Sequence, residues 1–289
     1  MRSDAKPRTS PGQLFIVATP IGNLADITLR AIDTLKRVDL IAAEDTRTSG
    51  KLLRHYQIAT PMIALHEHNE RSVIERIRAQ LLDGKHVALI SDAGTPLISD
   101  PGYPLVRAVR EAGLKVVPIP GPSSLTSALC AAGLPTQPLL FLGFLPRSGK
   151  ARRACLQRMA ASDCTSLIFE SPHRLLRTLK ELAGLCDGQR LCCVAREITK
   201  LHEEFRLAPI DEQIAHFSAS PARGECVLLL APGEPDGHTV SDAQILACAE
   251  QAEWATLPPA KKARHIARLL NVPKKRVYAL LARQSHEHD

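Results

Sequence analysis

The residues of this chain with the most evident chemistry lie in the run SDAGTPLISDPG at positions 91–102. The run follows four apolar residues, 87–90, which are typical of a strand buried on both faces. Its paired Ser-Asp steps, glycines and prolines predict a rigid, polar, tightly turned loop. Open α/β sheets bind ligands at the carboxyl ends of their strands, so the loop is either a ligand site or an ordinary turn-rich connection.

Two further apolar runs, 14–19 and 115–119, end in loops of similar character. Glycines such as Gly22 and Gly94 would let the backbone approach a ligand without a Cβ in the way. Ser123 and Ser124 precede an apolar helix and can cap its start. The free N–H groups of that helix start would also suit a carboxylate, a phosphate or a sulfonium-linked amino-acid group.

Charged side chains follow several other predicted strands, at the edge where a cleft would lie. The sets are Glu44, Asp45 and Arg47; His66, His68 and Asn69; Glu170, His173 and Arg174; and Arg196, Glu197 and Lys200. Each set either faces an acceptor substrate or forms a helix cap or surface ion pair. His66 and His68 supply only two metal ligands, so no metal site is predicted.

Alternating strands and helices must position these loops in the first half of the chain. Strands are predicted at 14–19, 40–43, 62–65, 87–90 and 116–119, and helices at 29–38, 73–84 and 105–113. This alternation indicates a mainly parallel sheet with helices on both faces.

The second half predicts an α+β domain with a mixed sheet. Its strands are expected at 139–145, 166–169, 191–194, 202–207 and 226–230, with helices near 150–161, 174–185 and 209–217. After a turn-rich linker at 232–237, two short basic helices broken at 271–273 fit a helix-turn-helix or a simple helical hairpin. The predicted parts are a disordered leader 1–12, an N-terminal α/β domain 13–120, a second α/β domain 121–234, and a linker with a basic helical module 235–289.

Positive charge is concentrated in the last of these parts. The chain has 289 residues and a net charge of +7. Residues 254–286 contain no Asp or Glu and eight basic residues: Lys261, Lys262, Arg264, Arg268, Lys274, Lys275, Arg276 and Arg283. This asymmetry favours a polyanionic partner, the alternative being a solubilising helix face.

No run approaches the ~20 apolar residues of a membrane span, the leader lacks a signal core, and the scattered cysteines predict reduced thiols, all of which favour a cytoplasmic protein without a membrane partner.

Eight short motifs, in order, carry a resemblance that covers roughly residues 13–285. They are VATPIGNL (17–24), AEDTR (43–47), LHEHNE (65–70), SDAGTPLISDPG (91–102), PGPSS (120–124), GFLP (143–146), ESPHR (170–174) and REITK (196–200). The chain resembles the tetrapyrrole methylase superfamily of S-adenosylmethionine (SAM)-dependent methyltransferases, and within it the bacterial enzymes that methylate small-subunit ribosomal RNA. The resemblance implies two α/β domains with the SAM cleft between them, a small helical C-terminal module and a homodimer.

The resemblance also implies roles for residues of these motifs. It carries SAM binding onto Pro20, Gly22, Asp92, Gly94, Thr95, Pro96, Ile98, Ser123 and Ser124. The resemblance does not identify the catalytic base, which would accept a proton from the acceptor during methyl transfer. Our candidates for this base are Asp45 and Lys200. The residues predicted to contact the acceptor are Arg47, His173, Arg174, Arg196, Lys274, Lys275 and Arg276. No metal is implied.

The acceptor separates three functional hypotheses. The first is methylation of the 2′-hydroxyl of a cytidine in 16S ribosomal RNA within the small ribosomal subunit, which the basic tail favours. The second is methylation of a tetrapyrrole precursor by an enzyme of the same fold. The third is a non-catalytic RNA-binding assembly factor. An aromatic content of only 3% leaves little surface for base stacking, which weighs against RNA.

Overall fold

The computed structural model describes residues 10–66, 69–233, 242–250, 257–270, 272 and 274–286. The chain divides into two compact units, one ending at Pro232 and one starting at Gly233. None of the helices in the described ranges is both long enough and apolar enough to cross a membrane. Residues 1–9 of the predicted leader lie outside the described residues, and the domain boundaries at 120 and 234 stay predictions.

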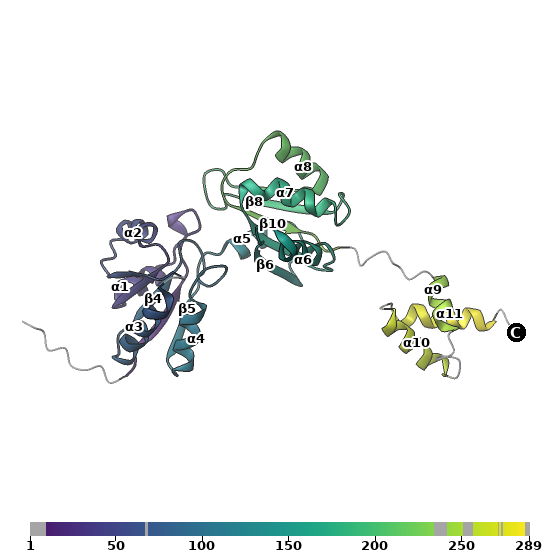
Figure 1. Cartoon of the computed structure of the whole chain (residues 1–289), viewed down its shortest axis with the longest axis horizontal. Helices are drawn as coiled ribbons and strands as arrows, with labels where there is room; N and C mark the ends of the chain where they lie inside the picture. The colour runs from purple at the N-terminus through teal and green to yellow at the C-terminus, as the bar shows by residue number, and fades with distance from the viewer. Residues whose placement is uncertain are drawn as a thin grey trace, which may run out of the picture. The chain divides into compact units, whose positions relative to one another are not determined.

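The first sheet of the N-terminal unit is fully parallel, as predicted (Figure 1). Its strands are β1 (Gln13–Val17), β2 (Leu40–Ala43), β3 (Met62–Ala64), β4 (Val87–Ile90) and β5 (Lys115–Ile119), in the order β3-β2-β4-β1-β5. Every residue of β2 and β4 is buried, because these inner strands are covered on both faces. One hydrophobic cluster lies on each face of the sheet.

The helices that connect these strands in the sequence pack on the sheet. They are α1 (Leu29–Arg37), α2 (Thr46–His55), α3 (Glu70–Leu82) and α4 (Tyr103–Glu111), with a single 3-10 turn η1 (Leu24–Asp26) before α1. Thr28 caps α1 by accepting a hydrogen bond from the backbone N–H of Ala31. Helix α2 was not predicted. It begins after Asp45, whose carboxylate accepts the N–H of Arg47, and it buries Leu52 and Leu53.

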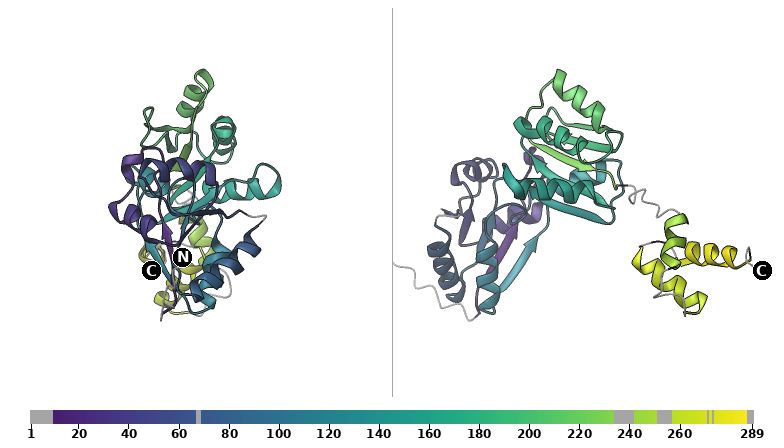
Figure 2. Two further views of the ribbon diagram at one scale, coloured as in Figure 1. Left: turned by 90° about the vertical axis from the view of Figure 1, so that its left-hand side faces the viewer. Right: turned by 45° about the vertical axis from the view of Figure 1, so that its right-hand side comes forward.

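The second sheet is mixed, as predicted. Its strands are β6 (Leu139–Phe144), β7 (Thr165–Glu170), β8 (Leu191–Arg196), β9 (Glu204–Pro209) and β10 (Cys226–Leu230), in the order β6-β7-β10-β8-β9. Only β6 and β7 are parallel. The helices are α5 (Ser124–Ala131), α6 (Gly149–Ala160), α7 (Pro172–Ala183) and α8 (Ile210–Ala219). The two sheets and the fold class therefore agree with the sequence analysis, and Figure 2 shows each sheet with its helices.

The two sheets of this unit are joined through the loop that follows β1. Ile21 is buried in the same hydrophobic cluster as Phe169 and Ile198 of the second half. The backbone N–H of Asn23 donates to the hydroxyl of Thr199, at 3.1 Å. A Cβ on Gly22 would lie 2.5 Å from Cγ of Lys200, so the close approach of the two loops requires glycine at this position.

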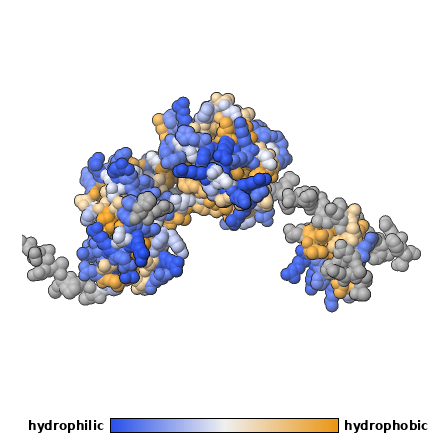
Figure 3. Space-filling view, in the orientation of Figure 1, coloured by the Kyte–Doolittle hydropathy of each residue, from blue (hydrophilic) through white to orange (hydrophobic). Residues whose placement is uncertain are grey.

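The C-terminal unit consists of helices α9 (Asp242–Ala249), α10 (Pro259–Leu269) and α11 (Lys274–His286) in the described ranges. Ile245, Ile266 and Val277 contribute one residue from each helix to its buried core. The two later helices were predicted from the sequence, whereas α9 was not. The face in view in Figure 3 carries both hydrophobic and hydrophilic residues on this unit.

Candidate functional site

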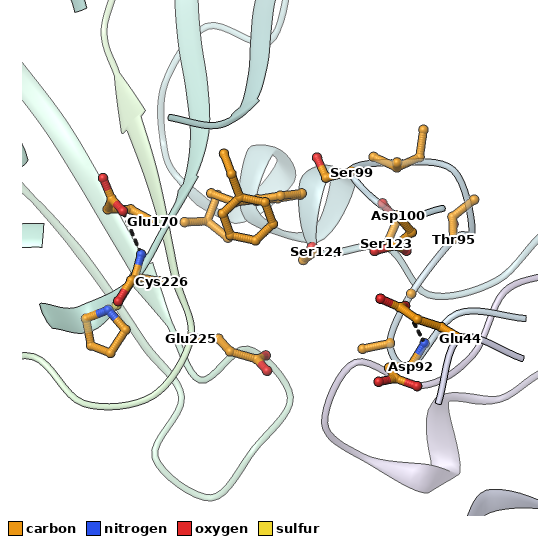
Figure 4. A pocket seen from close by; sticks show the side chains of 18 residues that line it. Glu44, Asp92, Thr95, Ser99, Asp100, Ser123, Ser124, Glu170, Glu225 and Cys226 are labelled. Carbon is orange, nitrogen blue, oxygen red and sulfur yellow. Dashed lines mark hydrogen bonds between the residues drawn. The ribbon is translucent and has the colours of Figure 1, made fainter. Parts of the chain in front are cut away.

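A pocket of about 420 Å³ lies where loops of the first sheet meet strand ends of the second (Figure 4). Its volume is within the ~300–1,000 Å³ range of small-molecule sites. The loop after β4 supplies one wall, from Asp92 to Asp100, and Glu44 joins it after β2. Phe144, Phe169 and Glu225 belong to the lining from the second half. The pocket thus sits at the carboxyl edge of the parallel sheet, where such sheets bind ligands.

Backbone pairing fixes the shape of the loop after β4. Thr19 and Gly94 exchange two backbone hydrogen bonds, at 2.9 and 3.0 Å, in an isolated antiparallel bridge. The hydroxyl of Thr95 donates to the carbonyl of Pro122 at 3.1 Å. Gly94 has a φ of 84°, and the non-glycine residues Leu97 and Ser99 both have a φ of 72°. The loop stores local backbone strain, which is a feature of ligand-binding segments.

Three carboxyl groups from the parallel sheet line the pocket, and all three have raised pKa values. Burial is the largest cause for Glu44, Asp92 and Asp100. The backbone N–H of Asp45 donates to Asp92, and the backbone N–H of Asp92 donates to Glu44. Burial raises the pKa of Asp100 to about 6, and the charges of Glu44 and Asp92 act in the same direction, while a hydrogen bond with Ser91 opposes it.

The raised pKa of Asp100 predicts that the stability of the folded protein depends on pH. Its ordinary pKa is 3.8 and its folded pKa about 6, so between these values the folded state binds more protons and becomes less stable as pH rises. Asp100→Asn should raise Tm at pH 8 by more than ~2 °C, the shift that ~1 kcal/mol gives at this size. The gain should shrink through pH 6 and vanish below pH ~4. Calorimetry without ligand measures it; the exposed Asp163→Asn is the control. A pH-independent gain would contradict the linkage.

Ser123 and Ser124 lie at the start of α5 and line the pocket, close to Thr95, Ser99 and Asp100 in Figure 4. Ser123 occupies the N-cap position, but its side chain makes no capping hydrogen bond. The expected cap is thus met in position only, and only by Ser123, because Ser124 is already the first residue of the helix. Helix α5 therefore begins at the pocket. The first N–H groups of a helix have no partner within it, so this end of the helix favours a negatively charged ligand group.

The predicted SAM residues divide into two groups in the structure. Those that line the pocket are Asp92, Gly94, Thr95, Ile98, Ser123 and Ser124. Pro20, Gly22 and Pro96 are not among its lining residues. Gly22 instead packs against the turn at 198–200, so its missing Cβ serves contact between the two halves.

Neither residue named as a base lines the pocket. Hydrogen bonds from Arg47 lower the pKa of Asp45 to about 2, which makes this carboxylate a weak base. Burial acts to lower the pKa of Lys200, but hydrogen bonds and charges of Glu197 and Glu225 outweigh it and raise the pKa overall. Lys200 is thus held as an ammonium ion. These interactions argue against both assignments.

The charged motifs of the second half form ion pairs beside the pocket. The Glu170 carboxylate, fully buried, pairs with Arg174 at 2.7 Å and accepts the hydroxyl of Thr178, also at 2.7 Å. Arg152, itself buried, lies 3.7 Å from Glu170. Arg196 pairs with Glu204. His173 lies instead in a shallow groove with Arg177. Arg174 and Arg196 are therefore engaged within the protein.

The predicted acceptor residues of the tail differ in their surroundings. Lys274 is exposed. Arg276 forms an ion pair with Asp242 at 2.7 Å, and the side chain of Lys275 lies outside the described residues. His68 also lies outside the described residues. In the ranges that the structure describes, no three His, Cys, Asp or Glu side chains are grouped as metal ligands.

Asp100, Phe144 and Phe169 line the pocket but were not among the site residues predicted from the sequence. Asp100 lies in the loop at 91–102, so the sequence indicated its place near a strand end but not its burial. Phe144 lies in the motif at 143–146, to which no role was given. Nothing in the sequence distinguishes Phe169 from an ordinary core residue.

Comparisons with known proteins agree on the family. The family model for Tetrapyrrole (Corrin/Porphyrin) Methylases matches residues 13–213. The chain is 44% identical over 283 residues to "Ribosomal RNA small subunit methyltransferase I" of Escherichia coli O157:H7, covering 96% of this chain and 97% of that protein. It is 43% identical over 270 residues to the protein of the same name from Synechocystis sp., covering 93% of this chain and 97% of the relative.

Solved structures of the same fold are more distant in sequence. A cobalt precorrin-4 methyltransferase of cobalamin biosynthesis matches with a TM-score of 0.60 at 17% identity, covering 76% of this chain and 94% of that one. Uroporphyrin-III C-methyltransferase from Thermus thermophilus, complexed with S-adenosyl homocysteine, matches with a TM-score of 0.56 at 18% identity, covering 76% and 97%. At these identities the likeness concerns the fold.

Proposed function

This chain belongs to the tetrapyrrole methylase family, and within it to the ribosomal RNA small subunit methyltransferases I; on that premise we propose that it transfers a methyl group from SAM to the 2′-hydroxyl of a cytidine in 16S ribosomal RNA. The resemblance in the sequence motifs is thereby confirmed at the level of the family. The observation that carries the proposal is similarity to these relatives over 93–96% of the chain.

The pocket fits SAM in size and in charge. Its three carboxyl groups complement a positively charged sulfonium and ammonium, and the start of α5 complements a carboxylate. When bound, SAM supplies a methyl group on a good leaving group. We assign its binding to Asp92, Gly94, Thr95, Ile98, Ser123 and Ser124.

The chain's own residues then have two tasks in the transfer. The first is to hold the acceptor hydroxyl in line with the methyl carbon, because positioning accounts for much of the acceleration in such displacements. The second is to accept the proton that leaves the hydroxyl as the new C–O bond forms. Asp100 suits this task better than Asp45 or Lys200, since a pocket carboxylate with a pKa of about 6 is ionised at neutral pH and is a stronger base.

The other two hypotheses receive less support. The relatives similar over most of the chain are ribosomal RNA enzymes, whereas the tetrapyrrole enzymes match at 17–18% identity. The assembly factor would not need a donor pocket. We place the protein in the cytoplasm on account of its proposed ribosomal substrate.

The test is methylation of small ribosomal subunits from cells that lack this protein. The purified chain and SAM should make one cytidine of the 16S RNA resistant to alkaline cleavage on its 3′ side, because a methylated 2′-oxygen cannot attack the adjacent phosphate. An unchanged cleavage ladder, with RNA binding retained, would support the assembly factor. Methyl transfer to uroporphyrinogen alone would support the tetrapyrrole enzyme.

The assembly state follows from the same premise. We infer a two-fold homodimer, the arrangement that is commonest among soluble oligomers. Light scattering at micromolar concentration should give twice the chain mass of 31.5 kDa. A mass of one chain would contradict the dimer and leave the proposed activity untouched.

A further inference from the structure

The end of strand β6 contains an irregularity that determines where Phe144 points. Phe141 pairs with Leu167 of β7, but the next pair is Phe144 with Phe169, so β6 has one residue more than β7 in this interval. Gly143 lies in the irregular step with a φ of 63°. This is a β-bulge with a glycine in the left-handed region, a device that redirects side chains beside functional sites.

The bulge moves Phe144 to the other face of the sheet. In a regular strand Phe144 would share a face with Leu142, because side chains alternate. Leu142 packs on the cluster that contains Leu145, whereas Phe141 packs on the opposite cluster with Phe169. The ring of Phe144 nevertheless lies with Phe169, at a centroid distance of 5.4 Å. The extra residue therefore takes Phe144 out of the regular alternation and into the pocket.

Phe144 is also the only one of the six phenylalanines that is exposed. Its side chain is 58% exposed, although it lines a pocket in a chain with only ten aromatic Phe, Tyr and Trp residues. Its neighbour Phe169 is 9% exposed and supports it from within. An apolar ring held open to solvent at a pocket contributes little to folding, so its exposed face is available to a planar ligand.

We propose that Phe144 is the platform on which the base of the acceptor nucleotide stacks. The inference rests on the proposed function and adds to it a residue that selects the substrate. Unpaired RNA bases stack on aromatic side chains, and the amino group of cytosine donates to carboxylates such as those that line the same pocket. The adenine of SAM has the same planar chemistry. We assign Phe144 to the acceptor because the donor, a small molecule, is expected against the buried lining, while the more exposed ring meets the incoming RNA.

The experiment compares Phe144→Ala, Phe144→Leu and Phe144→Tyr in the full-length chain. Loss of one stacked base should raise KM for the small subunit, or Kd for a short single-stranded RNA with a central cytidine, by about 5- to 150-fold. Phe144→Leu should show most of this loss of affinity although it keeps an apolar side chain. Phe144→Tyr keeps an aromatic ring and should bind RNA as the parent does. SAM affinity by calorimetry should change less than about twofold.

A matched control is Tyr103→Ala. Tyr103 is 64% exposed and does not line the pocket, so its replacement should leave both affinities unchanged. Phe144→Trp gives a spectroscopic test, because indole fluorescence should be quenched when a base stacks on it.

The results separate this inference from the proposed function. Unchanged RNA affinity in Phe144→Ala, or full binding by Phe144→Leu, would overturn the stacking role. A selective loss of SAM affinity would assign the ring to the donor's adenine and overturn the acceptor assignment. If the parent methylates no subunit, the proposed function fails, and the RNA-binding comparison still decides whether Phe144 holds a base.

Discussion

Replacing Gly94 by Val should weaken SAM binding by about 5- to 150-fold. Gly94 has a φ of 84°, a region that β-branched residues avoid, and a Cβ there would lie 3.2 Å from Cγ2 of Ile21. The expected strain of ~1–3 kcal/mol is relieved only if the loop moves, and 1.4 kcal/mol corresponds to tenfold in affinity. Because Gly94 pairs with Thr19, such a movement displaces both loops from the pocket edge.

The matched control is Gly113→Val. Gly113 also has a positive φ, 71°, but apart from its chain neighbours no atom of the described residues would lie within 4 Å of its Cβ, and it does not line the pocket. Both variants should lose stability to a similar degree, and only Gly94→Val should lose SAM. Calorimetric titration of folded protein decides the question. Undiminished affinity in Gly94→Val would remove this loop from the donor site.

Deleting residues 238–289 should spare SAM binding and strongly reduce methylation of the small subunit. All assigned donor residues precede residue 125, whereas the deletion removes the eight basic residues of the tail. If these meet phosphates, the log–log salt slope of binding should be roughly −5 to −7, from about 0.7 to 0.9 ions released per contact. Raising salt from ~50 to ~200 mM should then weaken the parent by about 10³-fold or more, and the truncated chain far less.

Substitution within the tail gives a sharper form of this experiment. Arg276 is paired with Asp242, so neutralising Lys274, Lys275 and Arg276 removes one charge that is already engaged. Lys261, Arg264 and Arg268 are exposed along one face of α10. Changing these three to Gln should flatten the slope by about two to three units. An unchanged slope would show that this face does not contact RNA, and would favour a small substrate.

The sequence predicted those parts of the fold in which local pattern and tertiary environment agree. Strands β2 and β4 match their predicted residues because each is a short apolar run covered on both faces. Helix α2 was missed because residues 46–51 are polar and include Gly50, which disfavours a helix. It is stabilised by the Asp45 cap and by burial of Leu52 and Leu53, and only the second of these depends on tertiary structure.

The site was predictable in its loops but not in its contacts. The loop at 91–102 was identified by composition, and it does line the pocket. A glycine in a sequence, however, indicates only that some group lies close to the backbone, and not which group it is. At Gly22 the close neighbour is the turn at 198–200 of the same chain. The bulge at Gly143 could not be foreseen either, because register depends on a partner strand that the local sequence does not specify.

The pocket draws its lining from both sheets, and this has a consequence for how the protein matures. Glu44 and Val227 lie far apart in the first unit's sequence, yet they line one cavity. Contacts between such distant segments form slowly, since the loop entropy is lost before they contribute. A nascent chain that has completed only the parallel sheet has one wall of the pocket and lacks the other. Ligand affinity should therefore appear last in refolding, after both sheets have formed, and report on the finished unit rather than on either half.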